Sequence, residues 1–185
     1  MDATDKILVA GCSGSGKTTW LKAESAKYDR VVHWDIEGEY AGQLVRLADL
    51  PHLLQRRAFR AVYRPQFAKS VDDLPREFSA LAGLLLEFDC NCLLTVDEAL
   101  TVLPPGGKTG GLGELLLRGR KRGLSLMYAT QYLSQIPRLV EAARELVLFH
   151  LDGNGAQAVL RNYLDDDRLR RVAALPPHQF IRLQK

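Results

Sequence analysis

The residues with the clearest chemical signature are the eight at positions 11–18, which read G-C-S-G-S-G-K-T. They fit the phosphate-binding pattern G-x-x-x-x-G-K-[ST] without a mismatch. Its glycines let backbone N–H groups turn inward around phosphate oxygens, and the helix N-terminus that follows favours anions. Lys17 is expected to reach the β- and γ-phosphates of a nucleotide, and the Thr18 hydroxyl to bind Mg²⁺. The predicted nucleotide-binding residues are Gly11, Ser13, Gly14, Ser15, Gly16, Lys17, Thr18 and Thr19.

Two acidic residues follow an apolar segment in the middle of the chain. Residues 92–96 are typical of a buried strand, and Asp97 and Glu98 come directly after it. An acid at a strand end can hold Mg²⁺ opposite the Thr18 hydroxyl, and its neighbour can polarise a water for in-line attack on a γ-phosphate. We therefore predict that Asp97 is a metal ligand and Glu98 a catalytic residue. The alternative for Glu98 is a first-turn helix acid favoured by the helix dipole.

A glutamine ends a second apolar segment. Residues 124–131 predict a strand that, in this topology, lies beside the strand of the phosphate loop, and Thr130 and Gln131 are its last residues. A glutamine amide at that point can contact the γ-phosphate or the attacking water. Gln131 is therefore predicted to be catalytic, with an ordinary polar strand end as the alternative.

The elements that must position these side chains alternate between strands and helices. Strands are predicted at residues 6–10, 30–36, 59–64, 92–96, 124–131 and 145–151, with an edge strand at 180–183. Helices are predicted at residues 19–24, 43–55 with an interruption at Pro51, 70–89 and 112–122, and a Gly- and Pro-rich loop at 104–111. This order predicts an α/β fold with a mostly parallel sheet, helices on both faces and ligands at the carboxyl ends of the strands.

Size and composition fit one soluble domain. The chain has 185 residues, of which 46% are hydrophobic and 25% charged, so a single domain over residues 1–185 is expected. No apolar run reaches 18 residues and the start of the chain is polar, which predicts no signal peptide, no membrane insertion and a cytoplasmic location. The 3 cysteines lack the C-x-x-C spacing and the 4 histidines are scattered, which argues against a zinc site. A net charge of +3 is too small to establish nucleic-acid binding.

Three further segments resemble the HerA–FtsK superfamily of ring-shaped DNA-pumping ATPases. They are D-I-E-G-E-Y at residues 35–40, V-D-E at 96–98, and the segment from the basic residues at 120–122 to Gln131; Q-I-P-R at 135–138 resembles the family's following turn. The resemblance runs from Ile7 to about Leu151. Within the superfamily the chain looks most like the small genome-packaging ATPases of membrane-containing double-stranded DNA viruses.

The resemblance implies an overall design. It implies a RecA-like (ASCE) P-loop NTPase fold, ATP and Mg²⁺ as cofactors, double-stranded DNA as partner and a ring of five or six copies. It also implies pumping of DNA into a preformed capsid, with capsid vertex or portal proteins as further partners, and a place in the host cytoplasm or at a capsid vertex.

The resemblance also implies specific residues. An arginine finger acting on a neighbour's γ-phosphate is expected among Arg118, Arg120 and Arg122, with Arg120 the best match to the family segment. Guanidinium can stabilise charge on the transferred phosphoryl group. Tyr132 departs from the pattern, because many relatives have arginine after Thr-Gln.

Other assignments are open at the level of the sequence. Glu39 is the alternative to Glu98 as the acid that polarises water. Lys108, in the Gly-rich loop, could touch DNA phosphates or belong to a simple connection. Residues 152–155 could approach the base.

Other functional classes fit the sequence less well. A small P-loop kinase is weakened by the paired acids, by the Thr-Gln strand and by the lack of an Arg-rich lid. A GTP-binding switch lacks its Asn-Lys-x-Asp segment. A filamentous-phage assembly ATPase should carry a transmembrane segment. Another cellular DNA pump of the same superfamily stays open.

Overall fold

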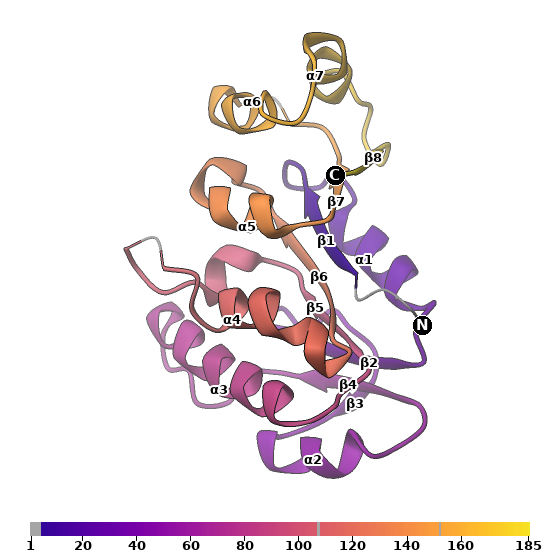
Figure 1. Cartoon of the computed structure of the whole chain (residues 1–185), viewed down its shortest axis with the longest axis vertical. Coiled ribbons are helices and arrows are strands. Elements are labelled where there is room, and N and C mark those ends of the chain that lie inside the picture. Colours follow the sequence, from indigo (N-terminus) through magenta and orange to yellow (C-terminus); the bar gives the residue numbers. More distant parts are fainter. Residues whose placement is uncertain (1–4, 107, 152) are drawn as a thin grey trace.

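Eight strands form one sheet in the order β3-β4-β2-β5-β6-β1-β7-β8 (Figure 1). This computed structural model describes residues 5–106, 108–151 and 153–185. Neighbouring strands are parallel, except that β8 runs antiparallel to β7. The strands are β1 (Lys6–Ala10), β2 (Arg30–Trp34), β3 (Gln43–Leu44), β4 (Phe59–Tyr63), β5 (Leu93–Val96), β6 (Ser125–Thr130), β7 (Glu145–Leu148) and β8 (Ile181–Gln184). The predicted mostly parallel α/β sheet is confirmed, including its edge strand.

The strand order brings the predicted chemistry together. Strand β6 lies between β5 and β1, so the phosphate loop, the Asp97–Glu98 pair and Gln131 follow three adjacent strands. All residues of β5 and β6 are buried, as expected for central strands covered on both faces. Because parallel strands end at the same edge, the three segments meet there.

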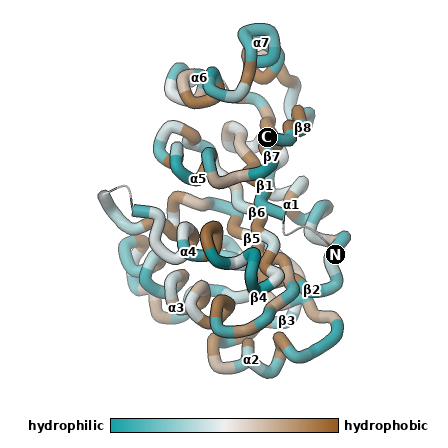
Figure 2. Tube along the Cα trace, viewed as in Figure 1, coloured by the Kyte–Doolittle hydropathy of each residue, from teal (hydrophilic) through white to brown (hydrophobic). Residues whose placement is uncertain are grey.

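Helices cover the two faces of the sheet unequally (Figures 1 and 2). The helices are α1 (Lys17–Ser25), α2 (Leu50–Leu53), α3 (Leu74–Glu87), α4 (Gly110–Arg118), α5 (Pro137–Ala142), α6 (Asn154–Leu160) and α7 (Asp166–Ala173). Apolar side chains of α2 to α7 join one core with one face of the strands. On the other face, Trp20 and Leu21 of α1 pack on Ile7, Val9 and Met127. Figure 2 shows the resulting pattern, with hydrophobic segments along the central strands.

Part of the predicted helix at residues 43–55 is wrong. Gln43 and Leu44 form strand β3, paired with β4, and a 3-10 helix at Leu47–Asp49 leads into α2. A Cβ on Gly42 would lie 2.7 Å from the carbonyl oxygen of Arg60, so glycine permits the close approach that starts this pairing. Pro51 does not interrupt a helix. It lies in the first turn of α2, where a missing N–H costs no hydrogen bond.

The boundary between the predicted loop at 104–111 and helix at 112–122 also differs. Helix α4 begins at Gly110 and ends at Arg118, and a 3-10 helix follows at Gly119–Arg122. A Cβ on Gly111 would lie 2.9 Å from the Cα of Ser79, so this glycine serves the close crossing of α3 and α4. The strand predicted at 30–36 stops at Trp34 because Asp35 begins a turn. Within the described ranges, no helix is long and apolar enough to span a bilayer.

Candidate nucleotide site

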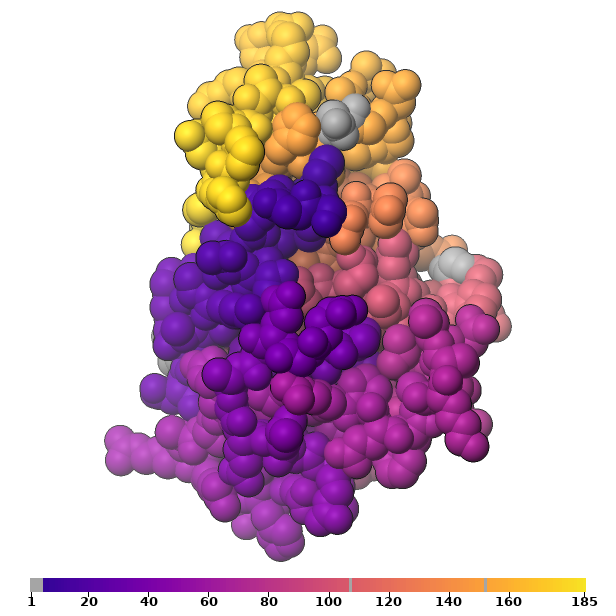
Figure 3. Space-filling model, turned by 180° about the vertical axis from the view of Figure 1, so that it is seen from behind, coloured from indigo at the N-terminus to yellow at the C-terminus, as the bar shows by residue number. Residues whose placement is uncertain are grey.

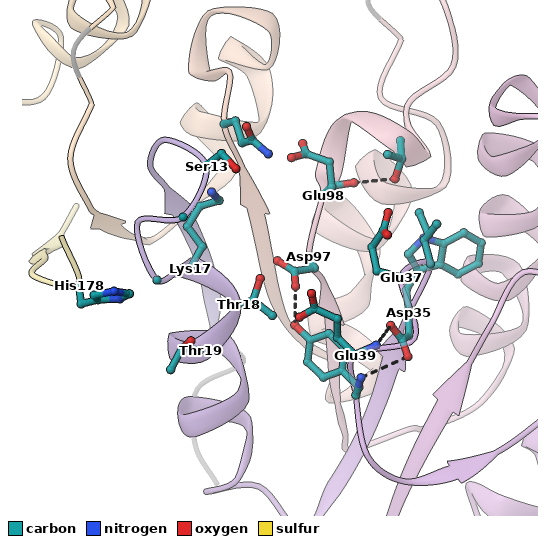
Figure 4. A pocket seen from close by; sticks show the side chains of 17 residues that line it. Ser13, Lys17, Thr18, Thr19, Asp35, Glu37, Glu39, Asp97, Glu98 and His178 are labelled. Atoms are coloured by element: carbon teal, nitrogen blue, oxygen red, sulfur yellow. Dashed lines mark hydrogen bonds between the residues drawn. The ribbon is translucent and has the colours of Figure 1, made fainter.

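A cavity of about 600 Å³ opens at the carboxyl ends of β1, β2, β5 and β6 (Figure 4). The phosphate loop and the first turn of α1 form one wall, and residues 34–40 form the opposite wall. Asp97, Glu98 and Gln131 lie between these walls, and His178 reaches the cavity from the C-terminal part of the chain. Its volume lies in the range of sites that hold small molecules and cofactors.

The phosphate loop has the backbone that its glycines predict. Gly14 and Gly16 have φ values of +72° and +106°, which L side chains adopt only with strain. Lys17 is buried, and its Nζ donates hydrogen bonds to the carbonyl oxygens of Gly11 and Cys12, each 2.9 Å away. Burial lowers the pKa of Lys17, although the negative charges of Glu98 and Asp97 act to raise it. An ammonium group has three donors, so one N–H remains for a phosphate oxygen.

The predicted magnesium ligands are in contact. The Thr18 hydroxyl lies beside the Asp97 carboxylate and acts to lower its pKa, and Tyr40 donates its hydroxyl hydrogen to Asp97 Oδ2 at 3.1 Å. Burial raises the pKa of Asp97, while the Thr18 and Tyr40 hydroxyls and the charge of Lys17 oppose the rise. A hydroxyl and a carboxylate side by side are oxygen ligands of the kind that Mg²⁺ prefers. The residues present therefore fit the ion, with Thr18 and Asp97 as the groups that would hold it.

Glu98 lies at the start of the 3-10 helix Ala99–Val102. Its side chain accepts a weak hydrogen bond from the Leu100 N–H, and the Thr130 hydroxyl donates to its Oε1, both at 3.4 Å. Burial raises the pKa of Glu98. Glu98 thus caps a helix start, as the alternative interpretation held, but it also lines the cavity, as Gln131 does. A residue that only caps a helix would not need the hydrogen bond that Glu98 accepts from Thr130 of strand β6.

The segment 35–40 is folded around its first residue. The buried Asp35 carboxylate accepts hydrogen bonds from the backbone N–H groups of Gly38, Glu39 and Tyr40, at 2.9, 2.9 and 3.3 Å. This turn directs Glu39 to the cavity (Figure 4), and Tyr40 lines the cavity as well. Glu39 forms an exposed ion pair with Lys22 at 3.0 Å. Sequence reasoning named the motif but missed the role of Tyr40, since nothing local in the sequence links residue 40 to residue 97.

Behind Tyr40 lies a buried polar network that the sequence did not indicate. The Tyr40 ring stacks on His33, with ring centroids 4.4 Å apart. His33 Nδ1 is 2.7 Å from the Thr95 hydroxyl, and its Nε2 is 3.1 Å from an Arg60 nitrogen. Burial and the Arg60 charge lower the pKa of His33 to about 4. A neutral His33 can accept from Arg60, so the network holds Tyr40 without titrating near neutral pH.

The three candidate arginines lie away from this cavity. Arg118 ends α4, and Arg120 and Arg122 lie in the following 3-10 helix, which precedes β6 and is therefore at the amino edge of the sheet. Arg118 pairs with Glu114 and Arg122 with Asp89. Arg120 is exposed and has no ion pair within the described residues. None of the three lines its own chain's cavity.

The remaining predicted residues are placed as follows. Ser13, Gly14, Gly16, Thr19 and Gln131 line the cavity. Gly11 and Ser15 lie in the loop but not among the lining residues, and the buried Ser15 hydroxyl has no hydrogen-bond partner among the described residues. Lys108 lines a second cavity instead. The suggestion that residues 152–155 approach the base includes Asp152, which lies outside the described residues; of the other three, none lines the first cavity.

Comparison with known proteins places the chain in context. No protein-family profile matches it. It is 26% identical over 135 residues to Protein P9 of Pseudoalteromonas phage PM2, a match that covers 72% of this chain and 62% of that protein. The chain therefore matches less than two thirds of the length of this relative.

Solved structures are similar over the whole chain. The genome packaging NTPase B204 from Sulfolobus turreted icosahedral virus 2, in complex with AMPPCP, superposes with a TM-score of 0.75 at 19% identity, covering 98% of this chain and 93% of that chain. VirB4 of Thermoanaerobacter pseudethanolicus gives a TM-score of 0.69 at 12% identity, covering 100% of this chain and 90% of that chain. The chain has the RecA-like fold of the P-loop ATPases, which the resemblance of its motifs implied, and it shares this fold with a viral genome packaging NTPase and with VirB4.

Proposed function

We propose that this chain hydrolyses ATP and uses the reaction to move double-stranded DNA, as the motor subunit that pumps a viral genome into a preformed capsid. The observation that carries the proposal is the convergence of Lys17, Thr18, Asp97, Glu98 and Gln131 in one cavity at the carboxyl edge of the sheet. The solved structure of a genome packaging NTPase with an ATP analogue, which shares the fold, supports it.

The residues of the cavity divide the work of phosphoryl transfer. Lys17 binds the β- and γ-phosphates through its remaining N–H. Glu98 orients a water and takes its proton as the water oxygen bonds to the γ-phosphorus, and the bond from that phosphorus to the bridging oxygen of ADP breaks. The raised pKa of Glu98 makes it a stronger base than an exposed carboxylate. Mg²⁺, held by Thr18 and Asp97, would neutralise charge on the phosphates.

Thr130 and Gln131 link this chemistry to the next strand. The Thr130 hydroxyl donates to Glu98 and accepts the Tyr132 N–H at 3.0 Å. Gln131 lines the cavity near Glu98, where its amide can contact the γ-phosphate or the attacking water. Loss of the γ-phosphate on hydrolysis can therefore alter the contacts of Thr130 and Gln131, and with them the position of the segment that follows β6.

A second cavity, of about 590 Å³, supports a coupling of this kind to DNA. It is bounded by the segment after Glu98 and by the segment after Gln131. Lys108 and Arg138 both line it, so two positively charged side chains border this cavity. Such residues bind phosphate oxygens without reading sequence, as a DNA pump requires. We therefore add Arg138 to Lys108 as a predicted DNA contact. Arg138 lies in the segment that follows Gln131, so it connects the nucleotide site to the second cavity.

Assembly in a ring would complete the site. Arg118, Arg120 and Arg122 are too far along the sheet to serve their own chain, so an arginine finger must come from a neighbour. We assign this role to Arg120, because ion pairs with carboxylates occupy Arg118 and Arg122. A motor of this type works in the host cytoplasm or at a capsid vertex, where vertex or portal proteins would hold the ring.

The test is ATP hydrolysis with and without double-stranded DNA, across protein concentration and at low and moderate salt. We expect turnover to rise steeply with concentration and with DNA. Glu98→Gln should keep ATP binding and lose about 10²–10⁴-fold in turnover. Glu87→Gln, an exposed change at the end of α3, serves as the matched control. Turnover indifferent to DNA and concentration would favour a self-contained kinase, and normal turnover in Glu98→Gln would bring Glu39 forward as the base.

A further inference from the structure

The nucleotide cavity has two chemically different ends (Figure 4). One end holds Glu98, the proposed base, whose carboxylate contacts Thr130, the residue before Gln131. The other end holds Thr19 and the His178 side chain, with Lys17 between the two ends (Figure 4). A nucleoside triphosphate is a linear molecule, so one whose γ-phosphate lies at Glu98 must direct its base toward Thr19 and His178.

His178 belongs to a strap, residues 176–180, that crosses the phosphate loop. Figure 3 shows C-terminal atoms, in yellow, packed against N-terminal atoms, in indigo. The His178 N–H donates to the Ser15 carbonyl at 3.1 Å, and the Gln179 N–H donates to the Pro176 carbonyl. Phe180 then contacts Trp20 and Phe149, with ring centroids 6.2 and 5.4 Å away. The strap is therefore anchored to the rest of the chain at His178 itself and at Phe180.

The backbone of His178 is unusual. Its φ is +64°, in the left-handed region that costs a non-glycine residue roughly 1–2 kcal/mol. A Cβ on Gly16 would lie 2.8 Å from His178 Nδ1, so the imidazole lies directly on the loop. The side chain is nonetheless exposed and lines the cavity. Strained backbone that presents an uncovered aromatic ring to a cavity is a feature of ligand sites rather than of cores.

We propose that the strap is the base subsite of the nucleotide cavity and that the His178 ring stacks on the nucleobase. The inference rests on the proposed function, because it needs a nucleoside triphosphate in this cavity. Stacking uses the face of the base and not its edge, so His178 contributes affinity for a nucleoside while the phosphate loop contributes affinity for the triphosphate. Loop and strap together then distinguish a nucleotide from a bare polyphosphate.

The test compares ATP with inorganic tripolyphosphate, which has the three phosphates and no base. The binding of both, with Mg²⁺, is measured by calorimetry or by competition against a fluorescent nucleotide. His178→Asn removes the ring but keeps a residue that tolerates positive φ. His178→Phe keeps an aromatic face. His52→Asn, at an exposed histidine of α2, is the matched control.

We expect His178→Asn to weaken ATP binding about fivefold or more and to change tripolyphosphate binding by less than about twofold. His178→Phe should retain ATP binding within about threefold of the unaltered protein, and His52→Asn should change neither ligand. Equal losses for both ligands, no loss for either, or a His178→Phe as weak as His178→Asn would each overturn the base subsite. If the unaltered protein binds neither ligand, the proposed nucleotide site itself fails, and this inference with it.

Discussion

Tyr40 offers a sharp test of how the site is organised. Its hydroxyl donates to Asp97 Oδ2 at 3.1 Å, and its ring stacks on His33. Tyr40→Phe deletes the hydrogen bond and keeps the ring, so the packing of residues 35–40 should survive. The change isolates one contact of the predicted Mg²⁺ ligand.

The size of the effect follows from the chemistry of that contact. A residue that hydrogen-bonds a metal ligand and orients it is typically worth about 10–100-fold in metal affinity. The lower value applies here, since Asp97 is only partly buried and the Thr18 hydroxyl still lies beside it. We therefore expect the Mg²⁺ concentration at half-maximal ATPase rate to rise about tenfold, with little change in the maximal rate.

The same bond sets a direction for the pH dependence. Asp97 works as a carboxylate, so activity is present above its pKa and is lost as the pH falls through it. Burial already raises this pKa and the Tyr40 bond opposes the rise, so Tyr40→Phe should move the acid limb of the rate to higher pH. His33 does not contribute near neutral pH, since its pKa is lowered to about 4.

The assay is a Mg²⁺ titration of ATP turnover at fixed ATP, repeated over a pH series. Tyr28→Phe is a matched control, because the Tyr28 hydroxyl also donates to an aspartate, Asp5, at 2.6 Å, outside the cavity. An unchanged Mg²⁺ dependence in Tyr40→Phe, or an equal change in Tyr28→Phe, would refute the reasoning.

Three further outcomes are expected. Mixtures of Arg120→Ala and Lys17→Ala subunits should regain ATPase activity that neither variant has alone, because each interface needs one intact loop and one intact finger; no recovery at any ratio would exclude Arg120 acting in trans. The double variant Lys108→Ala/Arg138→Ala should keep basal turnover and lose DNA stimulation, with a shallower salt dependence of DNA binding; full stimulation by DNA would remove the second cavity from the mechanism. Glu77→Ala should lower the free energy of unfolding by about 3 kcal/mol in urea denaturation, since the buried Glu77 carboxylate accepts four hydrogen bonds; a loss below about 1 kcal/mol would contradict that role.

Features encoded by adjacent residues could be predicted from the sequence. The phosphate loop, the Asp97–Glu98 pair and the strands before them depend on local apolar runs and local glycine geometry, and the structure has them where the sequence places them. The β3 strand could not be predicted, because its two residues are held by pairing with β4 and have no periodicity of their own.

Features that depend on distant partners were missed. Tyr40 meets Asp97, and His178 meets Ser15, across many residues of chain. Gly111 looked like part of a loop, but a contact with Ser79 explains it. A tyrosine, a histidine or a glycine can have several structural roles, and the role it has here depends on residues that are distant in the sequence and close in the fold.

The position of β1 has a consequence for synthesis in the cell. This strand carries the phosphate loop, yet both of its neighbours, β6 and β7, come more than a hundred residues later in the chain. During translation, β1 and the apolar side of α1 leave the ribosome well before β6 and β7, and β1 stays unpaired until those strands have followed. Pairing of parallel strands over such sequence separations is slow, and it leaves hydrophobic surface and an unpaired strand edge exposed in the meantime. Newly made chains are thus most vulnerable to aggregation before β6 emerges, and the nucleotide site is among the last parts to form.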